Sequence, residues 1–210
     1  MRAADPAAGR ASVRAAARTA AGASLVDLLI VVTIVASAAA LAVPPLTATA
    51  DAADAAAAAR HVAGLIGRAR FEAARRNRAV ALRFTTTAVE PTFSLVVDGD
   101  GDGVSAADVA SGVDAEIRPP DRLSDHFGGA RFAVAGSIPA IDGGVLSELD
   151  GAIRLGASQQ ISVAPLGTAT SGTIYIASRR GVQYAVRIAG VTGRVRVLRY
   201  VPGAVPWRPV

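Results

Sequence analysis

The chain has 210 residues, enough for one ordinary domain and an appendage, and 51% of them are hydrophobic but only 4% are aromatic. Alanine and valine must therefore supply much of any core. The absence of cysteine excludes disulfides, thiolate metal sites and a cysteine nucleophile. All 22 basic residues are arginine, and the formal net charge of +5 raises the question of a nucleic-acid partner.

The positive charge is unevenly distributed along the chain. Residues 1–22 carry four arginines and one acid, and positive charge ahead of an apolar segment holds that end in the cytoplasm. Without these residues the net charge falls to +2, from 22 − 4 = 18 arginines and 17 − 1 = 16 acids. Residues 84–150 hold 12 acids and 3 arginines, whereas residues 151–210 hold 8 arginines and no acid. Most of the excess positive charge therefore lies in residues 1–22 and is explained by membrane orientation. The basic character of residues 151–210 needs another explanation.

An apolar segment runs from Leu28 to Val43, interrupted only by Thr33 and Ser37. Counted from Ser24, it is about long enough to cross a hydrocarbon core of roughly 30 Å. One interpretation is a secretory signal peptide, cleaved after the A-x-A sequence at residues 40–42. A second is a plain single-span anchor. Neither gives a role to the glycine at position 22 or to the acid at position 27.

A third interpretation rests on residues 22–29, Gly-Ala-Ser-Leu-Val-Asp-Leu-Leu. This stretch resembles the processing site of type IV prepilins and type II secretion pseudopilins. The resemblance implies that a membrane-embedded prepilin peptidase cuts after Gly22 and methylates the new amine of Ala23. Asp27 is then the fifth mature residue and Pro44 the twenty-second, both in register with the family. The chain departs from the usual motif in having Ala23 for phenylalanine and Asp27 for glutamate.

Asp27 lies at the edge of the apolar segment, where a carboxylate is energetically unfavourable unless it has a partner. It costs about 2.5–3.5 kcal/mol if it reaches the centre of a membrane helix. The resemblance implies that Asp27 neutralises the N-terminal amine of a neighbouring subunit during assembly, which removes the burial cost of both charges. The alternative is that the side chain merely extends to the lipid headgroups.

A second helical stretch follows Pro44 and Pro45, which should bend or interrupt the first. Residues 48–74 are rich in alanine and favour a helix. An apolar stripe at intervals of three or four predicts that one face is buried, and Asn77 is a plausible end. The stripe consists of Val62, Leu65, Ile66, Ala69 and Ala73.

From residue 79 the apolar pattern changes to a period of two, which indicates strands. Glycine, proline, aspartate and serine separate them, so we expect an antiparallel sheet or sandwich with the helix on one face. The predicted strands are Val80–Phe84, Phe93–Val97, Arg131–Ala135, Ala152–Leu155, Gln160–Ala164, Thr173–Ser178, Gln183–Ile188 and Arg194–Tyr200.

Three blocks narrow the resemblance to the GspH/FimT family of minor pseudopilins and pilin-like proteins. They are residues 68–84 at the helix–strand junction, the aspartate–glycine loop within 95–104, and the terminal hairpin within 164–197. The family implies an α+β, pilin-like fold in which a long N-terminal helix, transmembrane in its first half, packs on an antiparallel β-sandwich. We therefore expect a cytoplasmic leader (1–22), an assembly helix (23–45), its amphipathic continuation (46–78) and a periplasmic β-domain (79–210).

The resemblance also implies a function and partners. The chain would be a structural subunit of a type II secretion pseudopilus in the bacterial inner membrane. Its partners would be other pseudopilins or minor pilins, the prepilin peptidase and the inner-membrane assembly platform. The alternative is a minor type IV pilin that binds DNA for uptake.

The aspartates of the 95–104 block suggest a calcium loop. Asp98, Asp100 and Asp102 alternate with glycines, and Asp108 follows, so oxygens at positions 1, 3 and 5 of a turn could converge on a cation. The closing ligand is wrong, because the twelfth position is Val109 and no bidentate glutamate follows. We therefore favour a solvated acidic turn over calcium, and expect no other cofactor.

The last predicted strand carries the candidate DNA contacts. Arg194 and Arg196 alternate with Val195 and Val197, so the arginines share one face while the valines enter the core. In the FimT branch a G-R-x-R element near the C-terminus is associated with DNA, and phosphate contacts need only accessible arginines. The alternatives are an ordinary solvent face and a surface for acidic residues of a neighbouring subunit.

No catalytic motif is recognisable. His61 and His126 have no serine, aspartate or metal-ligand partner at motif spacing, and phosphate-binding, dinucleotide-binding and nucleophile-elbow patterns are absent. We expect that the chain is not an enzyme but the substrate of one.

Overall fold

The computed structural model describes residues 24–203 and 206–210, without the side chains of residues 41–46. The chain divides into two compact units, residues 1–43 and 44–210. The fold is α+β, with a helix packed on antiparallel sheets. In chain order the elements are α1 (Leu25–Arg76), β1 (Val80–Thr85), β2 (Thr92–Val97), α2 (Ala106–Ser111), β3 (Ala115–Arg122), β4 (Arg131–Phe132), β5 (Ile138–Pro139), β6 (Val145–Leu146), β7 (Ile153–Arg154), β8 (Gln160–Val163), β9 (Gly172–Ala177), β10 (Gln183–Ala189), β11 (Arg194–Tyr200) and β12 (Trp207–Pro209).

Helix α1 is continuous through Pro44 and Pro45. Of the two predicted effects of the prolines, a bend or an interruption, the interruption is wrong. Each proline removes one backbone donor and crowds the carbonyl four residues earlier. The turns on both sides are rich in alanine, the residue with the highest helix propensity, and this favours continuation of the helix through the prolines. The helix ends at Arg76, and Asn77 takes a left-handed conformation with φ of 52°. The predicted end is therefore confirmed.

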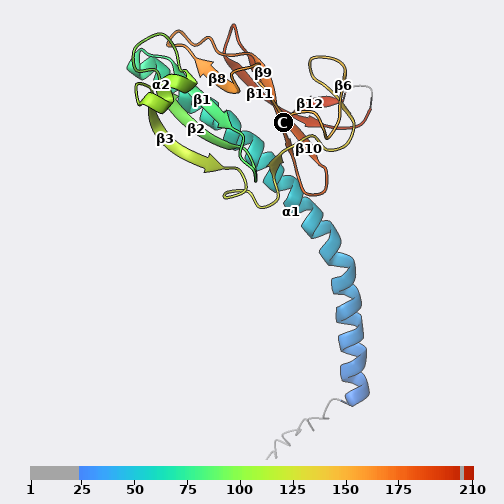
Figure 1. The fold of residues 1–210 in the computed structure, drawn as a ribbon. Coiled ribbons are helices and arrows are strands. Elements are labelled where there is room, and N and C mark those ends of the chain that lie inside the picture. Colours follow the sequence, from blue (N-terminus) through green and yellow to red (C-terminus); the bar gives the residue numbers. More distant parts are fainter. Residues whose placement is uncertain (1–23, 204–205) are drawn as a thin grey trace, which may run out of the picture. The chain divides into compact units, whose positions relative to one another are not determined.

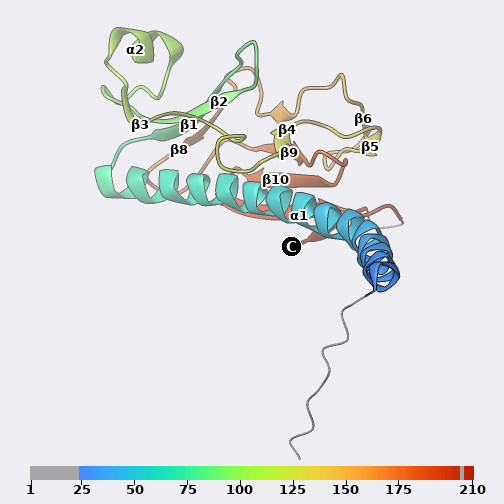
Figure 2. The same ribbon diagram turned by 90° about the horizontal axis from the view of Figure 1, so that it is seen from below.

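In the second unit, one face of α1 is buried from Ala55 onward against strands of both larger sheets (Figures 1 and 2). The five residues of the predicted stripe are all buried, which confirms it. Four further alanines extend the stripe toward the start of the unit. These are Ala55, Ala56, Ala58 and Ala59. Because alanine has the smallest side chain that favours a helix, this face lets the helix approach the sheets closely.

The strands form two larger sheets and a separate hairpin. The first sheet has the order β3-β2-β1-β8, and the second has the order β12-β11-β10-β9-β4, with β7 also paired to β9. Strands β5 and β6 pair only with each other among the described residues. Every pairing of these strands is antiparallel. One apolar core joins α1 to both sheets, and a smaller cluster around Tyr175 and Trp207 lies under the β5–β6 hairpin.

The predicted strands agree best with the structure in the centres of the sheets. Strands β1, β2, β8, β9, β10 and β11 lie within one or two residues of their predicted bounds. Strands β4 and β7 have only two residues each. Helix α2 and strands β3, β5, β6 and β12 were not predicted. Strand β3 contains Pro119 and Pro120, which argue against a central strand and are tolerated here because β3 is an edge.

The close approach of α1 to the sheets predicts a specific sensitivity. Ala58 has no exposed surface, so Ala58→Leu must displace the strands below it and should lower the free energy of unfolding by about 1–3 kcal/mol. Ala53→Leu, on an exposed position of the same helix, is the matched control and should change it little. Urea unfolding of both variants checks the prediction, and equal effects would contradict it.

Candidate functional site

The predicted processing residues Gly22 and Ala23 lie outside the described residues, but Asp27 lies in the first turn of α1. Its Oδ2 accepts a hydrogen bond from the backbone N–H of Ser24 (3.2 Å), and Ser24 Oγ accepts one from the N–H of Val26 (3.4 Å). These bonds satisfy donors that the start of a helix leaves free, as in a capping box. The sequence analysis missed this local role, although serine followed three residues later by an acid is its pattern.

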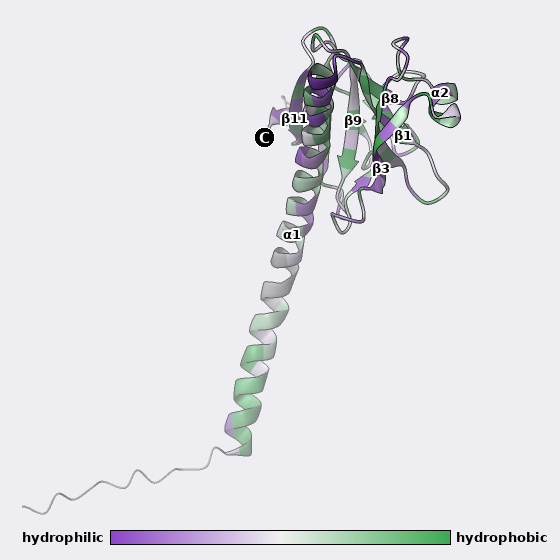
Figure 3. Cartoon of the chain, turned by 90° about the vertical axis from the view of Figure 1, so that its left-hand side faces the viewer, coloured by the Kyte–Doolittle hydropathy of each residue, from purple (hydrophilic) through white to green (hydrophobic). Residues whose placement is uncertain are grey.

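The first turns of α1 expose apolar side chains on every side. Nine large hydrophobic residues between positions 25 and 35 are each 51–74% exposed, and Figure 3 shows this end of α1 as predominantly hydrophobic. The hydroxyls of Thr33 and Ser37 donate to backbone carbonyls of the preceding turn, so neither needs an outside partner. Within residues 24–203 and 206–210, no helix reaches the length and apolarity of a membrane span. Pro44 lies inside α1, and its side chain is not among those described.

Three of the four predicted calcium ligands do come together. Carboxylate oxygens of Asp98, Asp100 and Asp102 lie within 4.8 Å of one another. Both oxygens of Asp98, which is buried, already accept backbone N–H groups, from Gly101 at 2.7 Å and Gly103 at 3.1 Å. A hydrogen bond with Asp100 and the negative charge of that group raise the pKa of Asp102. The turn thus brings like charges close together.

The fourth predicted ligand, Asp108, is not part of this group. Its carboxylate accepts from Ser105 Oγ, which in turn accepts from the backbone N–H of Asp108 and caps α2. The sequence analysis missed Asp114, a buried carboxylate that accepts the N–H groups of Gly99 (3.0 Å) and Ser105 (2.9 Å). The loop is therefore held by the protein's own donors. Asp100 and Asp102 alone fall short of the six to eight oxygens that calcium takes, so the residues fit a solvated turn better.

The second predicted site, on β11, has the expected alternation. Arg194 and Arg196 are exposed, whereas Val195 and Val197 are partly buried and pack against the main core. Arg187 on β10 stands directly opposite Arg196 and therefore shares its face. The third arginine of β11 does not join this group. Strand alternation places Arg199 on the face of the valines.

The neighbouring arginines of the β9–β10 turn serve another contact. The backbone N–H groups of Arg179 and Arg180 donate to the two carboxylate oxygens of Asp51 on α1, at 3.1 and 3.0 Å. Burial acts to raise the pKa of Asp51, but hydrogen bonds from Ser178 and these two N–H groups outweigh it and hold the pKa below its usual value. This end of the hairpin is therefore fastened to the helix.

Strand register builds a row of polar side chains on the outer face of the second sheet. Arg154 on β7 is opposite Thr173 on β9, Thr173 is opposite Arg187, and Arg187 is opposite Arg196. We call Arg154, Arg187, Arg194 and Arg196 the arginine face. Asp142, from the β5–β6 loop, accepts from Arg187 and, at 3.4 Å, from the hydroxyl of Thr173.

Two open concavities of about 580 and 550 Å³ adjoin the Asp142–Arg187 pair. Arg154 and Ser171 line the first, and Thr192, Arg194 and Arg196 line the second. The arginine face is therefore hollowed at two places that share Arg187, and Asp142 lines the first of them.

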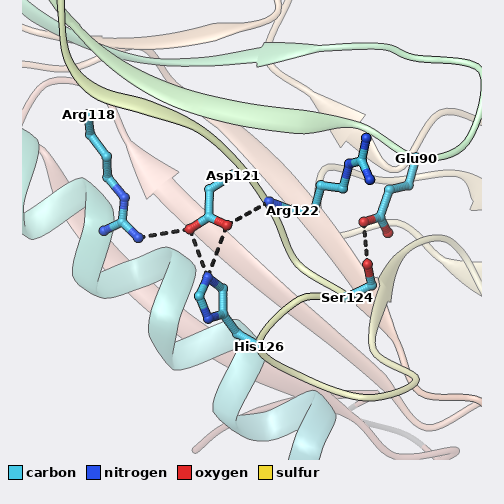
Figure 4. Close-up of polar contacts among 6 residues, drawn as sticks. All are labelled: Glu90, Arg118, Asp121, Arg122, Ser124 and His126. Carbon is cyan, nitrogen blue, oxygen red and sulfur yellow. Dashed lines mark hydrogen bonds and ion pairs between the residues drawn. The ribbon is translucent and has the colours of Figure 1, made fainter.

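The two histidines, which have no sequence motif, lie side by side. The ring centroids of His61 on α1 and His126 are 5.6 Å apart. His126 Nε2 lies 2.8 and 3.0 Å from the two carboxylate oxygens of Asp121, and Arg118 reaches the same carboxylate at 2.8 Å (Figure 4). The buried Nε2 of His61 has no hydrogen-bond partner among the described residues. The ring contacts of His61 with His126 and Phe127 hold the segment after β3 against the helix.

Comparison with protein-family models, with curated proteins and with solved structures found no match to this chain.

The histidine pair predicts a dependence of stability on pH. Burial, followed by the positive charges of Arg118 and His126, lowers the pKa of His61 below 6.5, although Asp121 acts to raise it. A group with a lowered pKa in the folded state favours folding in its neutral form. Its contribution is therefore complete above pH 6.5 and is lost as the pH falls through the folded pKa.

We expect the urea concentration at the unfolding midpoint to fall when the pH is lowered from about 7 to about 5. It should fall less in His61→Phe, which keeps an aromatic ring but cannot be protonated. The lowered pKa of Asp121 acts below 3.8 and therefore outside this window. The same fall in both proteins would contradict this prediction.

Proposed function

We propose that the chain is a minor pseudopilin, a structural subunit of a type II secretion pseudopilus. The observation that supports this proposal most is the apolar first part of α1, whose large side chains are exposed all round. Full burial of one such side chain contributes about 1.5–3 kcal/mol, so the segment has a strong tendency to be covered by other molecules. Lipid covers it before assembly, and the equivalent helices of neighbouring subunits cover it in a filament.

The proposed topology follows from the same segment. Residues 1–22 remain in the cytoplasm, residues 24–43 lie in the inner membrane, and the β-domain lies in the periplasm. Extraction of the helix from lipid is offset by its burial among neighbouring helices, so the subunit can leave the membrane only into an assembly. The prepilin peptidase and the assembly platform are the other partners of this step.

Asp27 has two roles in this proposal. It stabilises the start of the helix through a hydrogen bond from the N–H of Ser24. Ser24 directly follows Ala23, the residue on which cleavage after Gly22 would create a new amine. The carboxylate of one subunit then neutralises the amine of the next during assembly. Because both charges leave water together, each reduces the cost of burying the other.

The test is the intact mass of the N-terminal peptide of the full chain extracted from its native membrane. We expect a terminus at Ala23 that carries one methyl group. Asp27→Asn should still be cleaved but should lower the amount of sheared filament at least about tenfold, a loss of about 1.4 kcal/mol, and Asp27→Glu should restore it.

Ser24→Ala is the matched control for this experiment. It removes the capping hydroxyl and costs about 0.5–2 kcal/mol of helix stability, but it keeps the carboxylate and should keep assembly. A terminus at Val43 would instead indicate an ordinary secreted domain, and an uncut Met1 a static anchor. Either result would overturn the proposal.

The arginine face favours one second candidate, a minor type IV pilin that binds DNA for uptake. Its arginines lie on one side of the second sheet, two of them fully on the solvent side of β11. In that case the full chain in detergent should bind duplex DNA more weakly as salt rises, because each phosphate contact releases counterions.

Arg194→Ala with Arg196→Ala should lower the slope of log K against log salt by about 2 units. Arg199→Ala, on the other face of β11, is the control. Binding that depends equally on all three would contradict this candidate.

A further inference from the structure

We infer that the arginine face is a docking surface for the acidic loop of a second copy of this chain, so that copies associate head to tail. The inference rests on the proposed filament function and names a contact within it. It joins the residues around Arg187 of one copy to those around Asp102 of the next.

The first argument is the separation of charge within the second unit. Residues 98–116, which form the acidic loop with α2 and the start of β3, hold six acids and no arginine. Residues 151–210 hold eight arginines and no acid. In space, α2 and β11 lie at opposite sides of this unit, with β1 and β9 between them (Figure 3). The arginine face and the acidic loop therefore do not meet within one copy. The basic side chains beside the loop are Arg76 and Arg78, which line a hollow with Asp98 and Asp100, and Arg78 donates to the carbonyl of Gly99 at 2.7 Å.

The second argument is the kind of ligand that the arginine face already holds. The carboxylate of Asp142 is bound by Arg187 and by the hydroxyl of Thr173, which also accepts from Arg187 at 2.9 Å. An arginine beside a hydroxyl donor is a suitable receptor for a carboxylate. The two concavities on either side of this pair present Arg154 on one side and Arg194 with Arg196 on the other. They offer the same chemistry to further carboxylates.

The third argument concerns the acidic loop itself. Asp100 and Asp102 are exposed and close together, and a hydrogen bond with Asp100, followed by the negative charge of that group, raises the pKa of Asp102. A cation that approaches from outside relieves this repulsion. Asp98 and Asp114 are buried and fix the backbone of the loop through four N–H groups, so its two exposed carboxylates are presented on a well-defined turn.

A contact between two different surfaces of the same chain does not close on itself. It generates a ring or an open helical array, which suits a filament. Two copies of the chain could then be neighbours in the filament, so the chain would occupy consecutive positions rather than a single one.

Disulfide cross-linking tests this contact in the full chain, because the natural sequence has no cysteine to give a background. Ala110→Cys places a thiol on α2, and Val191→Cys places one on the β10–β11 turn beside Arg194; both positions are exposed. Two differently tagged chains, one with each thiol, are produced together and oxidised in the membrane. We expect a dimer from the mixed pair and none from either variant alone.

Charge reversal tests whether formation of the dimer depends on the charged residues. Arg194→Glu with Arg196→Glu in the Val191→Cys chain should lower the yield of dimer at least about tenfold. Asp100→Arg with Asp102→Arg in the Ala110→Cys chain should restore it. Leu149→Cys, which is 98% exposed on another loop, replaces Val191→Cys as the control and should give no dimer. If the reversed arginines prevent accumulation of the chain, the same measurement is made with glutamine at both positions.

The mass of the N-terminal peptide from the same membranes separates the two possible failures. Processing at Ala23 without the 110–191 dimer would overturn the docking surface and leave the filament proposal intact. An unprocessed chain would overturn the filament proposal. Protection of the thiol at position 191 by duplex DNA, without a dimer, would assign the arginine face to DNA instead.

Discussion

The structure depends on the close packing of the alanine-rich face of α1 against both sheets. The buried alanines on this face leave little space between helix and strands, and the larger residues Val62, Leu65 and Ile66 fill the gap between the sheets. Neither sheet pairs with the other through backbone hydrogen bonds among the described strands. The sheets are joined into one core by α1 and by side-chain contacts such as those of Phe84 and Phe93 with Phe132.

Much of this architecture could be predicted because its central elements follow simple periods. The helical stripe and strands such as β1 and β9 are buried strongly enough that their apolar pattern is clear. The strands that were missed in the two larger sheets, β3 and β12, lie at edges. Strand β3 contains two prolines and has no buried residue, and β12 has three residues. An edge strand pairs on one side only, and the surrounding loops influence its conformation. The local apolar pattern of the sequence therefore predicts such a strand poorly.

The candidate sites show a similar division between local and distant contacts. The sequence identified Asp98, Asp100 and Asp102 as a cluster because they lie within five residues of one another. It could not identify the bond of Asp142 to Arg187, 45 residues away, or the contact between His61 and His126. Such pairs arise from topology, which the residue pattern does not encode. Asp108 lies outside that cluster, and its carboxylate instead accepts a hydrogen bond from the hydroxyl of Ser105.

The fold of the single chain leaves the first turns of α1 exposed and keeps the arginine face apart from the acidic loop. In the proposed assembly a neighbouring subunit would satisfy both, but the two contributions would differ in kind. Burial of apolar surface is not directional and is not weakened by salt. Pairs of surface charges contribute little energy each and are screened beyond about 8–10 Å at physiological ionic strength, but they discriminate strongly between matched and mismatched orientations. The helix would therefore supply most of the free energy of assembly, and the charged surfaces would select which neighbour is accepted and how it is oriented.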